Sequence, residues 1–181
     1  MAAFDDPVSG WHSEHAYFGR LLDLLQDELG RLRRGRKANY EVMLDVVEYL
    51  HVYGDRYHHA REEAAFSFLA FHRPDLRERL NRLSEEHIAL AWVGERLLDE
   101  LNDVIEGFAS TLDDLQALTG TYLILYREHI ANEEAEIVSA ADVLTEEDWN
   151  SVSQAMPPRP DPLFGVTPDR RYQELLKTLE L

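Results

Sequence analysis

The chain has 181 residues, a formal net charge of -17 and no cysteine. This length favours a single domain that can bury a substantial core. The acidic balance argues against nucleic acid as a partner, because phosphate binding requires basic patches. The lack of cysteine excludes disulfides, iron–sulfur clusters and cysteine-based zinc sites. With no apolar run of membrane-spanning length and no secretory signal, we expect no membrane partner and a cytoplasmic location.

Apolar residues recur at spacings of three and four along most of the chain, which predicts amphipathic helices. Four long helices are expected, over about 11–34, 39–72 and 74–108 and from Thr111 to at least Ile137. Gly35 ends the first helix, and Pro74 separates the second from the third. Because the connections are short, we predict an all-α fold, an antiparallel up-down four-helix bundle over residues 1–148.

Residues 149–181 are predicted to form a C-terminal extension that packs on the bundle or trails it. Thr145 is a candidate cap for a short helix just before this extension. Four prolines between Pro157 and Pro162 exclude a helix in this segment. Thr167-Pro168 then opens a final short helix that ends near Leu179.

The most informative motif occurs twice. His58 and Glu62 are four residues apart in the second predicted helix, and His129 and Glu133 are four apart in the fourth. Residues at this spacing lie on one face of a helix, so each helix offers an imidazole and a carboxylate together. These ligand types bind transition metals such as iron. Two such helices that face each other can hold two metal ions, with both carboxylates shared between them.

Two further histidines, His15 and His87, lie on the apolar stripes of the first and third helices. Counting residues to the connecting turns places all four histidines of these helices within about 4.5 Å of one level along the bundle. A single histidine on an apolar stripe is more often a core residue with one hydrogen-bond partner. Four in one layer with two carboxylates favour a metal site instead, because burying carboxylates without a cation is costly.

The segments Glu14-His15, 58–63, Glu86-His87 and 129–134 resemble those of the hemerythrin-like family, also called the HHE cation-binding domain. The resemblance covers the chain from Glu14 to about Asp148. It implies a four-helix bundle around a non-haem di-iron centre, so that the cofactor would be two iron ions bridged by both glutamates. The ligands implied by the resemblance are His15, His58, Glu62, His87, His129 and Glu133.

The chain departs from the pattern of the oxygen-carrying hemerythrins. Those proteins have a second histidine one turn away on the third helix, where this chain has Leu83 and Ala91. Their fourth helix ends in an aspartate ligand, where this chain has Glu133. The site therefore resembles a six-ligand version with coordination positions open to water or exogenous ligands. The second glutamates of the two motifs, Glu63 and Glu134, can orient a ligand but are expected to be solvated.

Further histidines and a tyrosine lie near the predicted ligands in the sequence. His12 and His51 lie one or two helical turns before a predicted ligand histidine. Either can be a fifth histidine ligand, but we favour a hydrogen-bonding partner of a ligand or a surface position for both. His59 and His72 are expected to be exposed. Tyr126 is expected in the core, where its hydroxyl could donate to an iron-bound ligand.

These features favour a di-iron protein that binds or reacts with a small molecule, namely oxygen, nitric oxide or peroxide. A ferritin-like oxidase needs two Glu-x-x-His motifs, and only Glu48-x-x-His51 fits. The alternative is a non-catalytic iron or oxygen sensor or an iron store, including iron-centre repair. In this alternative the bundle would become ordered when metal binds, and the proline-rich tail would signal this change to a partner. A third alternative is a structural zinc site, and the argument against it is that structural zinc takes four ligands in a closed tetrahedron.

Overall fold

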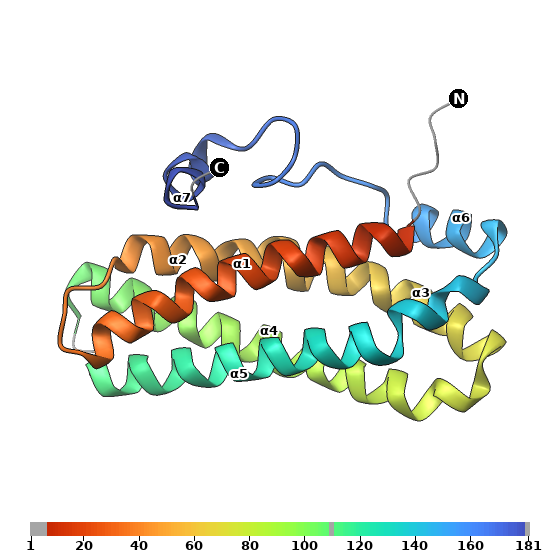
Figure 1. Cartoon of the computed structure of the whole chain (residues 1–181), viewed down its shortest axis with the longest axis horizontal. Coiled ribbons are helices and arrows are strands. Elements are labelled where there is room, and N and C mark those ends of the chain that lie inside the picture. Colours follow the sequence, from red (N-terminus) through yellow and green to blue (C-terminus); the bar gives the residue numbers. More distant parts are fainter. Residues whose placement is uncertain (1–6, 109–110, 180–181) are drawn as a thin grey trace.

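The computed structural model describes residues 7–108 and 111–179. Four long helical stretches run along the length of the molecule and lie side by side (Figure 1). They are α1 (Pro7–Arg33), then α2 (Tyr40–Tyr49) continued by η1 (Leu50–His59) and α3 (Ala60–His72), then α4 (Arg77–Glu106), then α5 (Leu112–Glu136). No strand occurs among the described residues. The fold is an all-helical bundle, as the apolar periodicity predicts.

The helix ends follow local sequence signals. Gly35 and Gly107 have positive φ values of 63° and 80°, and they terminate α1 and α4. The side chains of Asn39 and Thr111 accept a backbone N–H three residues later, and so they cap α2 and α5. A short 3₁₀ helix, η2 (Pro74–Leu76), joins α3 to α4. The predicted boundaries are therefore confirmed to within a few residues.

The second predicted helix contains a π-helical segment, η1, that the sequence does not predict. A π-helix bonds i to i+5, so it takes in more residues per turn than an α-helix. At the end of this segment, the successive histidines His58 and His59 are both buried, with exposed fractions of 0% and 2%. The expectation that His59 is exposed is therefore wrong.

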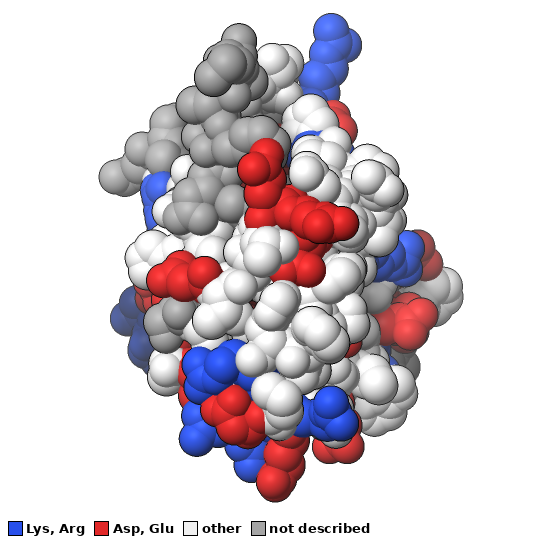
Figure 2. Space-filling view, turned by 90° about the vertical axis from the view of Figure 1, so that its right-hand side faces the viewer, with Lys and Arg blue, Asp and Glu red and all other residues white. Residues whose placement is uncertain are grey.

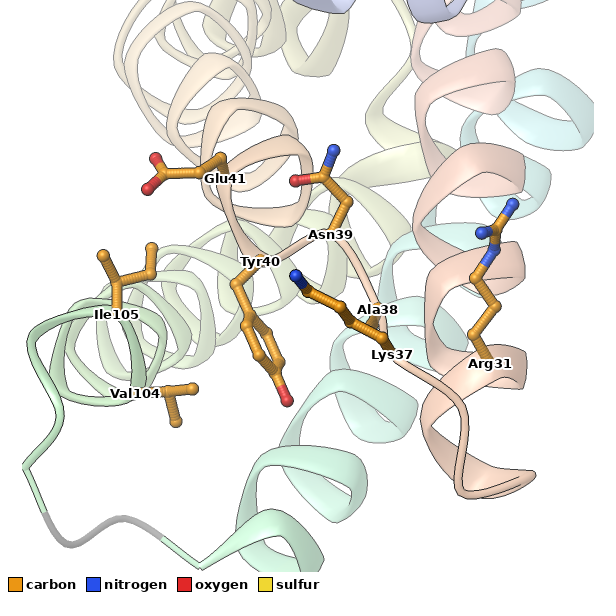
Figure 3. A pocket seen from close by; sticks show the side chains of 8 residues that line it. All are labelled: Arg31, Lys37, Ala38, Asn39, Tyr40, Glu41, Val104 and Ile105. Carbon is orange, nitrogen blue, oxygen red and sulfur yellow. The ribbon is translucent and has the colours of Figure 1, made fainter.

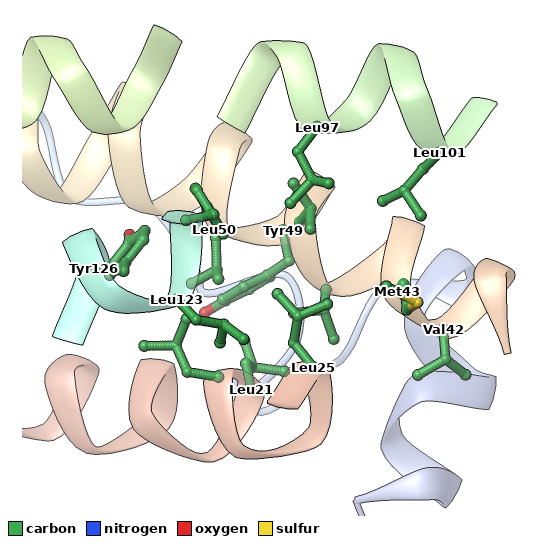
Figure 4. Close-up of a cluster of buried hydrophobic side chains, with 14 of the residues drawn as sticks. Leu21, Leu25, Val42, Met43, Tyr49, Leu50, Leu97, Leu101, Leu123 and Tyr126 are labelled. Atoms are coloured by element: carbon green, nitrogen blue, oxygen red, sulfur yellow. The ribbon is translucent and has the colours of Figure 1, made fainter. Parts of the chain in front are cut away.

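Two apolar cores fill the bundle, one toward each end. Figure 4 shows part of the larger core, where Leu97 of α4 lies across Tyr49 from Leu21 and Leu25 of α1. Leu123 of α5 belongs to the same core. The smaller core lies toward the other end, and its members include Trp11, Phe66, Leu69, Leu80, Leu83, Ile137 and Val152. In each long helical stretch, the predicted metal ligands lie between the residues of the two cores.

The chain continues beyond α5 with a 3₁₀ helix, η3 (Val138–Val143), and α6 (Glu146–Ala155). Thr145 caps α6 through a capping box, so that predicted helix is confirmed. A non-helical segment with four prolines follows, and then come η4 (Arg170–Tyr172) and α7 (Gln173–Thr178), which contacts α2 (Figure 1). The predicted domain boundary at residue 148 falls within α6 and stays a prediction.

Candidate metal centre

The structure brings all six predicted ligands into one buried cluster. His15 comes from α1, His58 from η1 and Glu62 from the first turn of α3. His87 comes from α4, whereas His129 and Glu133 come from α5. Each is at most 7% exposed.

On one side of the cluster, His15 and His58 point their Nε2 atoms at each other across 3.0 Å. Two donors bound to one ion at about 2.1 Å and about 90° apart are separated by about 3 Å. Glu62 Oε1 lies 3.1 Å from His58 Nε2, and Glu133 Oε2 lies 3.2 Å from His15 Nε2. These four residues form one group of side chains that can hold a metal ion.

On the other side, His87 and His129 approach the same two carboxylates. Glu133 Oε1 lies 3.3 Å from His87 Nε2, and Glu133 Oε2 lies 3.2 Å from His129 Nε2. Glu62 Oε2 lies 3.7 Å from His87 Nε2. Each glutamate therefore contacts histidines of both sides, as a carboxylate that bridges two ions must do.

Each of the four histidines has a second carboxylate at its outer nitrogen. Because an ionised carboxylate can only accept a hydrogen bond, Nδ1 carries the proton and Nε2 faces the cluster. This carboxylate–imidazole arrangement orients a metal-binding histidine and increases its basicity. The pairs are His15 with Glu134 at 2.7 Å, His58 with Glu14 at 2.7 Å, His87 with Glu63 at 2.7 Å and His129 with Glu86 at 2.9 Å.

These outer carboxylates connect the helices into a closed ring. In each pair the histidine and the carboxylate come from neighbouring helical stretches, so that every stretch both supplies and receives such a contact. Glu63 and Glu134 are partly solvated, with side chains 40% and 29% exposed, and each also orients a ligand histidine. Glu14 and Glu86 were not assigned this role from the sequence. The available signal is that all four carboxylates directly precede or follow a predicted ligand.

The remaining histidines lie outside the six-residue cluster. The His12 side chain is 69% exposed and contacts Glu134, so it is a surface partner of an outer carboxylate. His51 is buried but contacts Asp55 rather than a predicted ligand, with 3.2 Å between Nδ1 and Oδ2. His72 is exposed, as predicted, and contacts Asp148. His59 is buried beside His87 and His129 and forms a second group with them.

The charges of the cluster change its proton affinities. Burial alone would lower the pKa of His15 and His87, but contacts with ionised carboxylates outweigh it and raise these pKa values to about 11 and about 10. Burial alone would raise the pKa of Glu62 and Glu133, but the surrounding imidazoles hold it well below the usual value. The cluster thus concentrates negative charge that only cations, either protons or a metal, can balance.

The residues present fit a metal ion, as the hydrogen-bonding of the buried atoms indicates. Glu62 Oε2, His129 Nε2 and Glu133 Oε2 are fully buried and have no partner in hydrogen-bond geometry among the described residues. Such atoms cost about 1–3 kcal/mol each when they stay unsatisfied, and more when they are charged. A cation bound between them removes this cost. Imidazole and carboxylate donors without any thiolate suit iron.

A surface pocket lies elsewhere, between the end of α1, the start of α2 and the end of α4 (Figure 3). Its lining includes Arg31, near the end of α1, and Lys37, in the connection to α2. Arg31 is 16 residues beyond His15, or about 24 Å along the helix. At the other end of the molecule, basic side chains stand in separate groups beside acidic ones (Figure 2). That face offers no continuous basic surface.

A family model of the hemerythrin HHE cation-binding domain matches residues 6–141. The chain belongs to the hemerythrin HHE cation-binding family. The match contains all six predicted ligands and the four outer carboxylates of this HHE domain. No curated protein and no solved structure matches the chain significantly. None of the described helices of this HHE domain is long and apolar enough to cross a membrane.

Proposed function

We propose that this HHE domain is a non-haem di-iron protein. It binds or reacts with a small molecule, namely oxygen, nitric oxide or peroxide, at a carboxylate-bridged centre in an antiparallel up-down four-helix bundle. The observation that carries this proposal is the pair of shared carboxylates, Glu62 and Glu133, each in contact with histidines on both sides of the cluster. Family membership supports cation binding by the same region.

The number of donors supports a site that is open to ligands. With both glutamates shared, each iron ion would receive two imidazoles and two carboxylate oxygens from the six residues. Iron sites with two histidines and few carboxylates keep coordination positions for exogenous molecules, and iron at such positions exchanges electrons with them. An exogenous ligand is therefore the substrate class that this donor set favours.

The chain itself positions and shields the centre. The outer carboxylates keep the four Nε2 atoms directed inward, and the two apolar cores separate this layer from solvent at both ends. Phe18 packs edge-on against His58, with 4.9 Å between ring centroids. Exclusion of water strengthens the interaction between a cation and the buried carboxylates.

An anaerobic titration with Fe(II) tests the proposal. We expect two ions per chain at saturation, and we expect azide or nitric oxide to change the optical spectrum of the loaded protein. A saturating stoichiometry of one or zero would contradict the dinuclear site. An unchanged spectrum at high azide and nitric oxide concentrations would contradict the open coordination positions.

The sensor alternative is supported by a different observation. The C-terminal extension contacts the segment that carries His58: the Arg159 backbone N–H donates to the Tyr57 hydroxyl, and its guanidinium lies 4.4 Å from that ring. The neighbouring Tyr53 hydroxyl donates to Glu14, which also accepts from His58. Metal loading could therefore change how firmly the extension is bound.

Hydrogen exchange separates the two functions. In a sensor, residues 156–179 should exchange faster after removal of Fe(II), whereas turnover with peroxide or oxygen should be absent. In a protein that reacts with these molecules, turnover should be measurable, and protection of the extension should not depend on the metal.

A further inference from the structure

We propose that His59 is a seventh metal ligand, which gives the ion beside His87 and His129 a third imidazole. This inference rests on the proposed di-iron centre and assigns an additional protein ligand to one of its two ions.

The position of His59 matches that of a ligand. Ligand atoms of His59, His87 and His129 lie within 4.8 Å of one another, and all three residues are buried. The ring centroid of His59 is 4.2 Å from that of His87 and 5.0 Å from that of His129. The centroids of His15 and His58, which face each other through their Nε2 atoms, are 4.9 Å apart. His59 thus approaches the second side of the cluster as closely as the predicted ligands approach one another.

A carboxylate also lies near Nδ1 of His59, but it is farther away than at the other four histidines and comes from the same helical segment. Asp55 is four residues earlier in η1, and its Oδ1 lies 3.4 Å from His59 Nδ1. The two side chains are each 3% exposed. Neither of these two atoms has a hydrogen-bond partner among the described residues. A carboxylate at Nδ1 leaves Nε2 as the donor for a metal.

The π-helical segment, residues 50–59, carries both of the neighbouring, buried histidines His58 and His59. Successive side chains diverge by about 100° in an α-helix, and the wider turn of a π-helix makes this angle smaller. Such segments are rare and occur frequently at functional sites. Use of both histidines by the metal centre gives this segment a role that a single ligand would not require.

The consequence is an asymmetric centre. One ion would have four protein ligands, from His15, His58 and the two shared glutamates. The other would have five, from the three remaining histidines and the same glutamates. The two ions should therefore bind with different affinities, and exogenous ligands should prefer the ion with fewer protein donors.

A packing role is the competing explanation. The His59 ring stacks on His87 with 10° between their planes, and any planar aromatic ring could supply that contact. His59→Phe separates the two roles, because phenylalanine keeps an aromatic ring but has no donor nitrogen. His72→Phe is the matched control, because His72 is exposed and lies outside both groups of candidate ligands.

The experiment is an anaerobic Fe(II) titration followed by equilibrium dialysis of wild type and variants. We expect wild type and His72→Phe to bind two ions. In His59→Phe one ion should keep its affinity and the other should weaken by more than about tenfold. If His59→Phe binds both ions with wild-type affinity, His59 is not a ligand, but the di-iron function stands. If the wild-type protein itself binds fewer than two ions, the proposed di-iron function is wrong, and the assignment of His59 falls with it.

A second variant covers the case in which His59→Phe does not fold. Asp55→Asn keeps the His59 imidazole and removes the carboxylate charge behind it. We expect the same ion to weaken selectively, by a smaller factor than in His59→Phe. Unchanged binding of both ions by Asp55→Asn in that case would overturn the inference.

Discussion

Glu133 and Glu134 are successive residues of α5 with opposite orientations. Glu133 is 1% exposed and contacts three histidines at the centre of the cluster. The Glu134 side chain is 29% exposed and accepts from His15 and His12 at the edge of the bundle. The two carboxylates thus have different tasks: the first contacts the metal position and the second orients an imidazole.

This difference predicts unequal effects of two matched substitutions. Glu133→Gln removes a shared charge and should abolish binding of both Fe(II) ions. Glu134→Gln should weaken binding by about 10–100-fold, because it removes only the partner of His15 Nδ1. Glu128→Gln, an exposed position on the same helix, is the control and should bind normally. Metal analysis after anaerobic titration measures the difference. Equal losses in the first two variants would show that the wrong glutamate has been assigned to the metal.

Gly54 is required by the close approach of η1 to α5. A Cβ at this position would lie 2.5 Å from the Tyr126 hydroxyl, and the Tyr126 ring is fully buried. We therefore expect Gly54→Ala to reduce the free energy of unfolding by about 1–3 kcal/mol through overpacking. Urea denaturation of the metal-free protein measures this loss.

The control is Gly19→Ala in α1, where an added Cβ meets nothing within 4 Å. Because alanine is favoured over glycine inside a helix, this variant should be stabilised by up to about 1 kcal/mol. If both variants are stabilised, η1 and α5 do not approach each other as closely as the structure indicates.

At the scale of elements, the helices could be predicted because residues within each helix and at its ends are typical of helices. The apolar stripe defines the buried face, and Gly35, Asn39, Pro74 and Thr111 define ends that need no long-range information. The six-residue cluster was predicted because the i, i+4 motifs and the single histidines fall at one level of such helices.

The π-helical segment and the outer contacts could not be predicted in the same way. No local sequence signal distinguishes i+4 from i+5 bonding in η1, which packs against α1, α4 and Tyr126 of α5, so the orientation of His59 was predicted wrongly. The outer carboxylates sit next to predicted ligands in the sequence. Their partners nevertheless lie on other helices, and the choice of partner depends on which helices are neighbours.

The C-terminal extension is attached to the bundle by polar contacts and by apolar side chains. Asp161 accepts the Tyr49 hydroxyl at 2.9 Å and the backbone N–H groups of Leu163 and Phe164. Tyr49 is fully buried. The extension also contributes Leu163 to the larger core. The ordered position of this segment therefore depends on a charge-assisted polar contact as well as on apolar burial.

Asp161→Ala should consequently destabilise the protein by about 1–3 kcal/mol, because it leaves the Tyr49 hydroxyl without a partner. Tyr49→Phe removes the hydroxyl as well as its need for a partner, so it should cost less. A double-mutant cycle from urea unfolding measures the coupling between the two side chains. A coupling energy near zero would mean that this contact does not hold the extension.

At the scale of the whole molecule, a polar layer separates two apolar cores. In the metal-free protein this layer contains two ionised glutamates, and protons on the surrounding imidazoles balance their charge. Metal binding would replace those protons, because a coordinating imidazole must be neutral at Nε2. The stability of the bundle and its metal affinity should therefore depend on pH in opposite directions above pH 6.5.

The direction in which the stability of the metal-free protein changes with pH follows from the shifted pKa values. The raised pKa values of His15 and His87 give stability that is complete below pH 6.5 and is lost as the pH rises toward 10–11. The pKa of His59 is lowered, mainly by burial and also by nearby imidazole charges. Its contribution to the stability of the fold is therefore lost as the pH falls below 6.5. The lowered pKa values of Glu62 and Glu133 give stability that is lost below about 4.5. The metal-free protein should be most stable near pH 6.5.

Thermal unfolding of Fe(II)-loaded and chelator-treated protein at pH 6, 7 and 8 under anaerobic conditions tests this expectation. Between pH 6.5 and 8 the chelated protein should lose up to about 1.4 kcal/mol per pH unit for each histidine with a raised pKa. Loaded protein should lose less, so the increment due to metal should grow with pH. At free Fe(II) of about 100 times the dissociation constant, each ion adds about 2.7 kcal/mol to the free energy of unfolding.

Two outcomes would contradict this expectation. Equal stabilisation by metal at all three pH values would show that no proton leaves the imidazoles on binding. A melting temperature that does not respond to chelator would show that the layer is a polar core without a metal.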